Sequence, residues 1–171
     1  MKRARLLLAV ILYGLLPLST IGAAESTRPV FDQRSWKLGW SQQKDGAVFE
    51  EYVLEGESVE NWSELVTVQF FPDLQEKTNP DIFEASQKRN LTLVCPSIHW
   101  ESIFQAADER IWTWTIAGCP GQVDQSELAR LKRTNRGFHI WHYAIKKSPI
   151  PPDKEKTWLE NLKAMSVSQR E

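Results

Sequence analysis

The chain has 171 residues, a formal net charge of −1 and a hydrophobic fraction of 42%. This length suits one globular domain that can bury a core without additional cross-links. The near-neutral charge argues against a nucleic-acid partner, which requires a positively charged surface.

The N-terminal residues have the features of a secretory signal peptide. Three basic residues among the first five precede an apolar run from Leu6 to Leu18, and small residues follow up to Ala24. This order predicts export and cleavage after Ala24, with Ala23 as the second choice. An uncleaved anchor is the alternative, but the run is shorter than the roughly 20 residues of a membrane span. We therefore expect residues 1–24 to be a signal peptide and the protein to be periplasmic or secreted, without a stable membrane anchor.

The expected mature chain is mildly acidic. Cleavage removes three basic residues and leaves 18 basic against 22 acidic ones, a net charge near −4. Residues 25–35 are polar and predict an N-terminal tail, and residues 36–171 predict a single domain.

The first structured segment predicts a β-hairpin. Trp36, Leu38 and Trp40 alternate with other residues, so we expect them on one face of a strand. Residues 44–46, Lys-Asp-Gly, signal a turn, and residues 48–54 alternate as a second strand.

A third strand and a helix follow. Residues 65–71 are rich in β-branched and aromatic side chains. Asn79 suits a helix cap, Pro80 suits the first helical position, and Asp81 meets the positive end of the helix dipole. We therefore expect a helix from residue 80 to about residue 90.

The second half alternates with period two before a final amphipathic helix. The expected strands cover residues 98–104, 109–117, 127–134 and 138–145, and the expected helix covers residues 153–165. The whole order predicts an α+β fold, with an antiparallel sheet of about six strands and two helices packed on one of its faces.

Two cysteines, Cys95 and Cys119, remain in the expected mature chain. In an oxidising compartment a single pair most simply forms a disulfide. The alternative is a reactive thiol, but no C-x-x-C is present and no nearby residue favours a thiolate. We therefore expect one disulfide.

Residues 51–62 read E-Y-V-L-E-G-E-S-V-E-N-W, with Glu51-Tyr52-Val53, Gly56-Glu57 and Asn61-Trp62 as the distinctive positions. This motif resembles one in small exported proteins of Gram-negative bacteria that lack an assigned activity. The order of elements also resembles the Mog1/PsbP-like fold. That second resemblance implies a binding or assembly role, although a fold alone does not determine function.

The acidic stretch from residue 50 to residue 64 is the first candidate site. Paired carboxylates serve as general acid and base where their surroundings separate their pKa values. A solvated turn between two strands explains the same residues. We expect no catalytic residue here and retain Glu51, Glu57, Trp62 and Glu64 as possible binding residues.

The strand 138–145 holds the second candidate site. Alternation places His139, Trp141 and Tyr143 on one face and His142 on the other, so the two histidines cannot share a metal ion. The histidines show no metal-ligand spacing with the cysteines, and no G-x-S-x-G nucleophile motif is present. We retain His139, Trp141 and Tyr143 as possible binding residues and expect no metal and no cofactor.

Two further features leave alternatives open. The eight Trp residues indicate core positions, or an exposed set that binds sugar rings or a peptide. The basic residues near the second hairpin predict an anion-binding patch or a solvated hairpin; these are Arg130, Lys132, Arg133, Arg136, Lys146 and Lys147.

We therefore expect an exported, non-enzymatic binding or assembly protein with an unknown protein or small-molecule partner. The alternative is a small hydrolase with a carboxylate/His site in an aromatic cleft. A third possibility is an interaction domain that docks a partner along an exposed strand edge.

Overall fold

The computed structural model describes residues 31–166, so the expected signal peptide lies outside the described residues. The described elements are β1 (Trp36–Lys44), β2 (Ala47–Leu54), β3 (Glu64–Pro72), a 3-10 turn (Leu74–Glu76), α1 (Pro80–Val94), β4 (His99–Gln105), β5 (Glu109–Ile116), β6 (Gln125–Arg133), β7 (Gly137–Ile145) and α2 (Pro152–Ala164).

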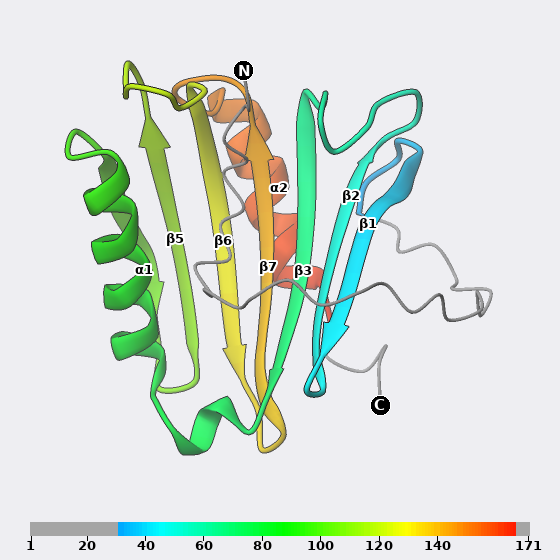
Figure 1. Ribbon diagram of the computed structural model, residues 1–171. Coiled ribbons are helices and arrows are strands. Elements are labelled where there is room, and N and C mark those ends of the chain that lie inside the picture. The colour runs from blue at the N-terminus through cyan, green and yellow to red at the C-terminus, as the bar shows by residue number, and fades with distance from the viewer. Residues whose placement is uncertain (1–30, 167–171) are drawn as a thin grey trace.

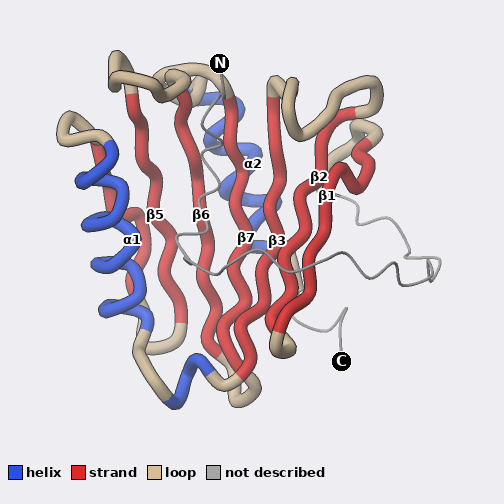
Figure 2. The backbone as a smooth tube through the Cα atoms, viewed as in Figure 1, coloured by secondary structure: helices blue, strands red, loops and turns tan. Residues whose placement is uncertain are grey.

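The strands form one antiparallel sheet in the order β1-β2-β3-β7-β6-β5-β4 (Figures 1 and 2). The prediction of an α+β fold with an antiparallel sheet is confirmed. The described sheet has seven strands rather than about six, because all four segments after α1 join it. β3 pairs with β7, so the chain returns to the centre of the sheet after building the β4–β5–β6 side.

The two helices lie on opposite faces of the sheet, and the prediction that both pack on one face is wrong (Figure 1). The reason is visible in β6. Its Leu128 packs into the core beneath α2, whereas Ala129 and Leu131 pack into the core beneath α1. A strand that is apolar on both faces needs a cover on both sides.

β1 also departs from simple alternation. Its register with β2 shifts between Leu38 and Trp40, which is the signature of a β-bulge. Trp36 and Leu38 lie on one face of the sheet, and Trp40 lies on the opposite face. Trp36 is buried, whereas Leu38 is half exposed. At the bulge, a Cβ on Gly39 would lie 2.8 Å from the Val59 side chain, so the bulge brings the β2–β3 loop close to β1.

The described part of the expected N-terminal tail packs against the sheet. Phe31 is buried and makes edge-to-face contacts with Trp36 and Tyr52, at centroid distances of 5.8 and 5.0 Å. Asp32 accepts a hydrogen bond from the Trp36 indole at 2.9 Å. Residues 31–35 therefore contribute to the core on the α2 side.

α1 begins as predicted and ends later than predicted. The Asn79 side chain caps it by accepting a hydrogen bond from the Ile82 amide at 2.9 Å. The helix continues to Val94 because Leu91 is buried against the sheet and draws the last turn into the core.

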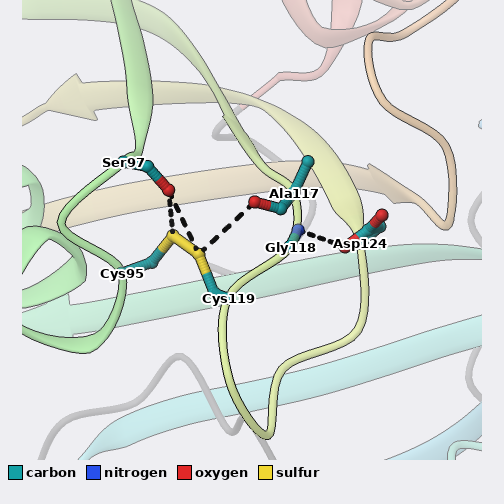
Figure 3. Close-up of a disulfide and its surroundings, with 6 residues drawn as sticks. All are labelled: Cys95, Ser97, Ala117, Gly118, Cys119 and Asp124. Atoms are coloured by element: carbon teal, nitrogen blue, oxygen red, sulfur yellow. Dashed lines mark hydrogen bonds between the residues drawn. A yellow bond between two sulfur atoms is a disulfide. The ribbon is translucent and has the colours of Figure 1, made fainter.

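The predicted disulfide joins Cys95 and Cys119, with their Cα atoms 5.6 Å apart (Figure 3). It ties the C-terminal end of α1 to the β5–β6 loop. The Ser97 hydroxyl lies 3.5 Å from the Cys95 sulfur and 3.6 Å from the Cys119 sulfur. Both cysteines are buried, so the bridge belongs to the core on the α1 side.

Candidate functional site

Glu64, the last residue of the acidic stretch, is the centre of a buried charge network. It is only 6% exposed at the start of β3. Its carboxylate accepts a hydrogen bond from Tyr143 at 2.7 Å and from Arg34 at 2.8 Å, and it pairs with Lys154 of α2. The network thereby connects the N-terminal segment, β3, β7 and α2.

The pKa values of this network follow from its contacts. Burial alone would raise the pKa of Glu64, but hydrogen bonds from Arg34, Lys154 and Tyr143 outweigh it and hold the pKa below its usual value. Burial and the hydrogen bond to Glu64 raise the pKa of Tyr143. Glu64 is therefore a charged carboxylate with every oxygen engaged, which suits an architectural role.

The other predicted residues of the acidic stretch lie apart from Glu64. Glu51 sits on β2, on the sheet face opposite to Tyr52. Glu57 accepts hydrogen bonds from the backbone and hydroxyl of Ser63, at 2.8 and 2.5 Å, and so closes the β2–β3 loop. Trp62 lies beneath the Lys146 ammonium, 4.6 Å from the ring centroid.

Among the predicted residues of β7, the structure brings Tyr143 to Glu64 but not His139. His139 is opposite Phe70, six residues from Glu64 along β3, which places it about 20 Å away. The rings of His139 and Trp141 are stacked, with their centroids 5.9 Å apart. Glu64 and His139 therefore do not form one site.

The basic residues near the second hairpin are not simply a solvated surface. Arg130 is 8% exposed and bonds to Glu109 at 2.8 Å. Its Nη1 nitrogen donates to the carbonyl oxygens of Leu162 and Met165, at 2.7 and 2.8 Å, which satisfies the C-terminal end of α2. Arg130 also lies over Trp141.

Lys132 is paired as well. Lys132 bonds to Asp108 at 2.7 Å and to Glu109 at 3.2 Å, and these bonds, the first above all, raise its pKa. Burial would raise the pKa of Glu109, but its bonds to Arg130 and Lys132 lower it overall. Arg130 and Lys132 therefore serve internal ion pairs.

The eight Trp residues are mostly core residues. Trp40, Trp62 and Trp100 are half-buried, and the other five are buried. Trp158 stacks on Tyr143 with a centroid distance of 4.0 Å, and Trp36 meets Trp158 edge to face. The core interpretation is thus favoured over an exposed Trp face.

A buried carboxylate–histidine pair lies on the α1 side of the sheet, and sequence reasoning missed it. His142 is 6% exposed, and its Nδ1 lies 2.7 Å from Glu127 of β6. The same carboxylate accepts a hydrogen bond from the Trp114 indole at 3.0 Å. His142 Nε2 is buried and has no hydrogen-bond partner among the described residues.

A cavity of about 380 Å³ lies on the α2 side of the sheet, at the β4 edge. We call it the edge cavity. Its lining residues come from β4, β5, the β7–α2 loop and α2: His99, Glu101, Thr113, Trp114, Thr115, Ser148, Pro149, Ile150 and Glu155. This set of described residues includes two carboxylates and no Lys or Arg.

The ionisable side chains of the edge cavity differ from the other acidic groups described above. Glu101, Glu155 and His99 make no side-chain hydrogen bond or ion pair within residues 31–166. The Thr113 hydroxyl donates to the Glu127 carbonyl at 2.8 Å, so its oxygen is left as an acceptor facing the cavity. The cavity therefore offers acceptors and negative charge to a ligand.

Only the β4 part of the edge cavity has a pattern that can be recognised in the sequence. His99 and Glu101 are two residues apart, so they share a face of the predicted strand. Glu155 comes from a helix some 50 positions later in the chain, and nothing in the sequence places it beside β4. The site was missed because it depends on the position of α2.

The described range offers neither a metal centre nor a membrane span. Within it, no three His, Cys, Asp or Glu side chains are arranged to hold a metal ion. Neither helix of that range has the length and apolar character needed to cross a bilayer.

A protein-family model matches residues 28–170 of the chain. The family is bacterial and its function is uncharacterised, in agreement with the predicted resemblance to bacterial proteins without an assigned activity. No curated protein matches the chain, and no solved structure matches it either. Because the family model covers most of the sequence, the chain belongs to this bacterial family.

Proposed function

We propose that the protein is an exported, non-enzymatic binding protein whose ligand is cationic and occupies the edge cavity. The observation that carries this proposal is the pair Glu101 and Glu155. These two carboxylates come from different elements, face one cavity, and have no side-chain partner within residues 31–166.

The chemistry of the cavity favours an ammonium or guanidinium group. A cation would gain charge-assisted hydrogen bonds from two carboxylates and further acceptors from the Thr113 and Thr115 hydroxyls. Pro149 and Ile150 offer apolar contact to the stem that carries the charge. The volume lies within the range of small-ligand pockets.

Export and a binding role are supported by separate observations. The sequence of residues 1–24 predicts a signal peptide, and the Cys95–Cys119 disulfide suits an oxidising compartment. The Mog1/PsbP-like resemblance, which is part of this proposal, implies binding or assembly rather than catalysis.

The test is a titration of the mature protein with soluble cations, followed by NMR and calorimetry. Arginine amide and 1,5-diaminopentane are the cationic probes, and glucose and acetate are the neutral and anionic controls. We expect the cations to shift the amide signals of β4, β5 and the start of α2. Glu155→Gln should weaken this binding by about tenfold, equivalent to about 1.4 kcal/mol.

Glu160→Gln is the matched control, because Glu160 is exposed on the same helix and does not line the cavity. It removes the same charge from the protein and should leave the affinity unchanged. If Glu155→Gln and Glu160→Gln weakened the binding of the cations equally, the overall charge of the protein would explain the effect, and the proposed site would be refuted. Cations that shift no cavity signal at millimolar concentration would refute the function itself.

The alternative function, a small hydrolase, is favoured by one observation, the Glu127–His142 pair. A neutral His that donates through Nδ1 to a carboxylate presents Nε2 as a base. Against this, His142 Nε2 is buried and bonds to no hydroxyl within residues 31–166. Turnover of an ester panel that disappears in His142→Asn, while the mutant remains folded, would establish the hydrolase in place of the binding protein.

A further inference from the structure

The edge cavity opens beside a free strand. β4 ends the sheet, and five of its seven residues are exposed. Within residues 31–166, its residues make no backbone hydrogen bond outside the pairing with β5. An edge strand presents alternate N–H and C=O groups that can pair with another chain.

We propose that the ligand of the edge cavity is a Lys or Arg side chain of an extended peptide, and that this peptide adds to β4 as an eighth strand. The inference rests on the proposed function, since it names the carrier of the cation. A peptide in this position supplies main-chain hydrogen bonds for affinity, and a side-chain pocket then supplies selectivity.

The geometry of β4 fits this arrangement. An added strand would lie about 4.8 Å from β4, with every second side chain on the face that carries the cavity. His99 and Glu101 are the β4 residues on that face that line the cavity. A long cationic side chain from the neighbouring strand can cross over β4 and meet Glu101 and Glu155.

The shape of the edge also limits which peptide can bind. The register of β4 shifts between Ser102 and Phe104, so its pairing with β5 is uninterrupted over His99–Ser102 and resumes at Phe104 after the bulge. Beyond the bulge, Phe104 is 43% exposed. We therefore expect a short extended segment, with an apolar residue placed to contact Phe104.

The opposite edge of the sheet lacks this combination. β1 has Lys37 and Lys44 along its length and a bulge against the β2–β3 loop, and none of its residues lines the edge cavity. A cationic peptide is thus directed to β4 by charge complementarity.

The bulge and the charge of β4 have a competing explanation, because both are devices that protect edges from unwanted pairing. Four probes separate the two explanations. The first is a capped pentapeptide with a central Lys between two Val residues. The second is the same peptide with alternate backbone nitrogens methylated, prepared in both registers. The third is N-acetyl-lysine methylamide, which has the cation without a strand. The fourth is the first peptide with norleucine in place of Lys, which has the strand without the cation.

Each probe is titrated into the mature protein by calorimetry, and amide exchange is followed by NMR. We expect the pentapeptide to bind at least about tenfold more tightly than the lysine amide. One methylated register should return to the affinity of the lysine amide. Amide exchange at residues 99–102 should slow only with the unmodified peptide.

The outcomes distinguish this inference from the proposed function. If the pentapeptide, both methylated peptides and the lysine amide bind equally, the cationic cavity stands and the added strand is wrong. If a peptide with norleucine in place of Lys binds as tightly as the first, the strand binds without the cavity and the inference is wrong. If nothing binds, both proposals fail.

Discussion

Two groups of carboxylates in this protein have opposite surroundings. Glu64 lies in the most conspicuous part of the sequence, is buried, and uses its oxygens on Tyr143, Arg34 and Lys154. Glu101 and Glu155 lie in inconspicuous segments, face a cavity and have no partner within residues 31–166. A dense acidic motif therefore identifies architecture here, and the two carboxylates that face a common cavity identify the candidate site.

The strongest test of the first group is Glu64→Ala. The substitution leaves the charges of Arg34 and Lys154 and the Tyr143 hydroxyl without their common acceptor. Removing one partner of a buried ion pair costs roughly 3–5 kcal/mol, and the lower limit of about 3 kcal/mol applies here because Arg34 and Lys154 are partly exposed. We expect a loss of this size in the free energy of unfolding, measured by urea denaturation of the mature protein.

The matched control is Glu57→Ala, since Glu57 closes only an exposed loop. It should cost far less than Glu64→Ala. Similar losses in the two variants would contradict the distinction between the Glu64 network and the rest of the acidic stretch.

The disulfide is the next largest contribution. It closes a loop with a sequence separation of 24 residues, for which chain entropy predicts about 3 kcal/mol. We expect the free energy of unfolding of the double variant Cys95→Ala, Cys119→Ala, measured by urea denaturation, to be lower by that amount. The edge cavity lies on the other face of the sheet, so binding of arginine amide to folded protein should persist. Loss of binding without loss of stability would contradict this separation.

Acid should weaken the Glu64 network. The pKa of Glu64 is lower in the folded protein than its usual value of 4.5, so its contribution to stability is complete above about pH 4.5. It disappears as the pH falls through the lowered folded-state pKa. We expect the stability difference between wild type and Glu64→Gln to shrink over that interval. A constant difference down to pH 2 would mean that Glu64 does not titrate with folding.

Sequence patterns predict the features that depend on neighbouring residues. The strand segments follow from alternation, and the start of α1 follows from Asn79 and Pro80. The faces covered by the two helices do not follow from alternation, because they depend on how β6 divides its side chains between two cores. The predicted facing of Trp40 is wrong because a single extra residue in a bulge reverses the facing of the residues after it.

The candidate sites show the same division. The sequence marks Glu64 as a candidate by its charge and Tyr143 by its place in an alternating strand. Their hydrogen bond forms only because β3 lies beside β7, which neither pattern predicts. The Glu127–His142 pair and the edge cavity each combine segments distant in sequence. Local sequence patterns do not identify such neighbours.

A smaller effect is expected at the start of α1. Asn79→Ala removes the side-chain acceptor of the Ile82 amide, and the loss of such a cap costs about 1 kcal/mol. Urea denaturation measures the loss. Asn79→Ser retains an acceptor and should recover most of the stability. No recovery with Ser would mean that Asn79 acts through another contact.

Glu101→Gln should give the smallest change in stability and the clearest change in binding. Glu101 is exposed and makes no side-chain ion pair within residues 31–166, so its charge does not hold the fold together. The urea midpoint should equal that of wild type within the error of the measurement, whereas the affinity for the lysine pentapeptide should fall by about tenfold. A drop in stability comparable to that of Glu64→Ala would show that the cavity carboxylates are architectural too. The contrast between the two groups would then disappear, and with it the reason for placing a ligand at the β4 edge.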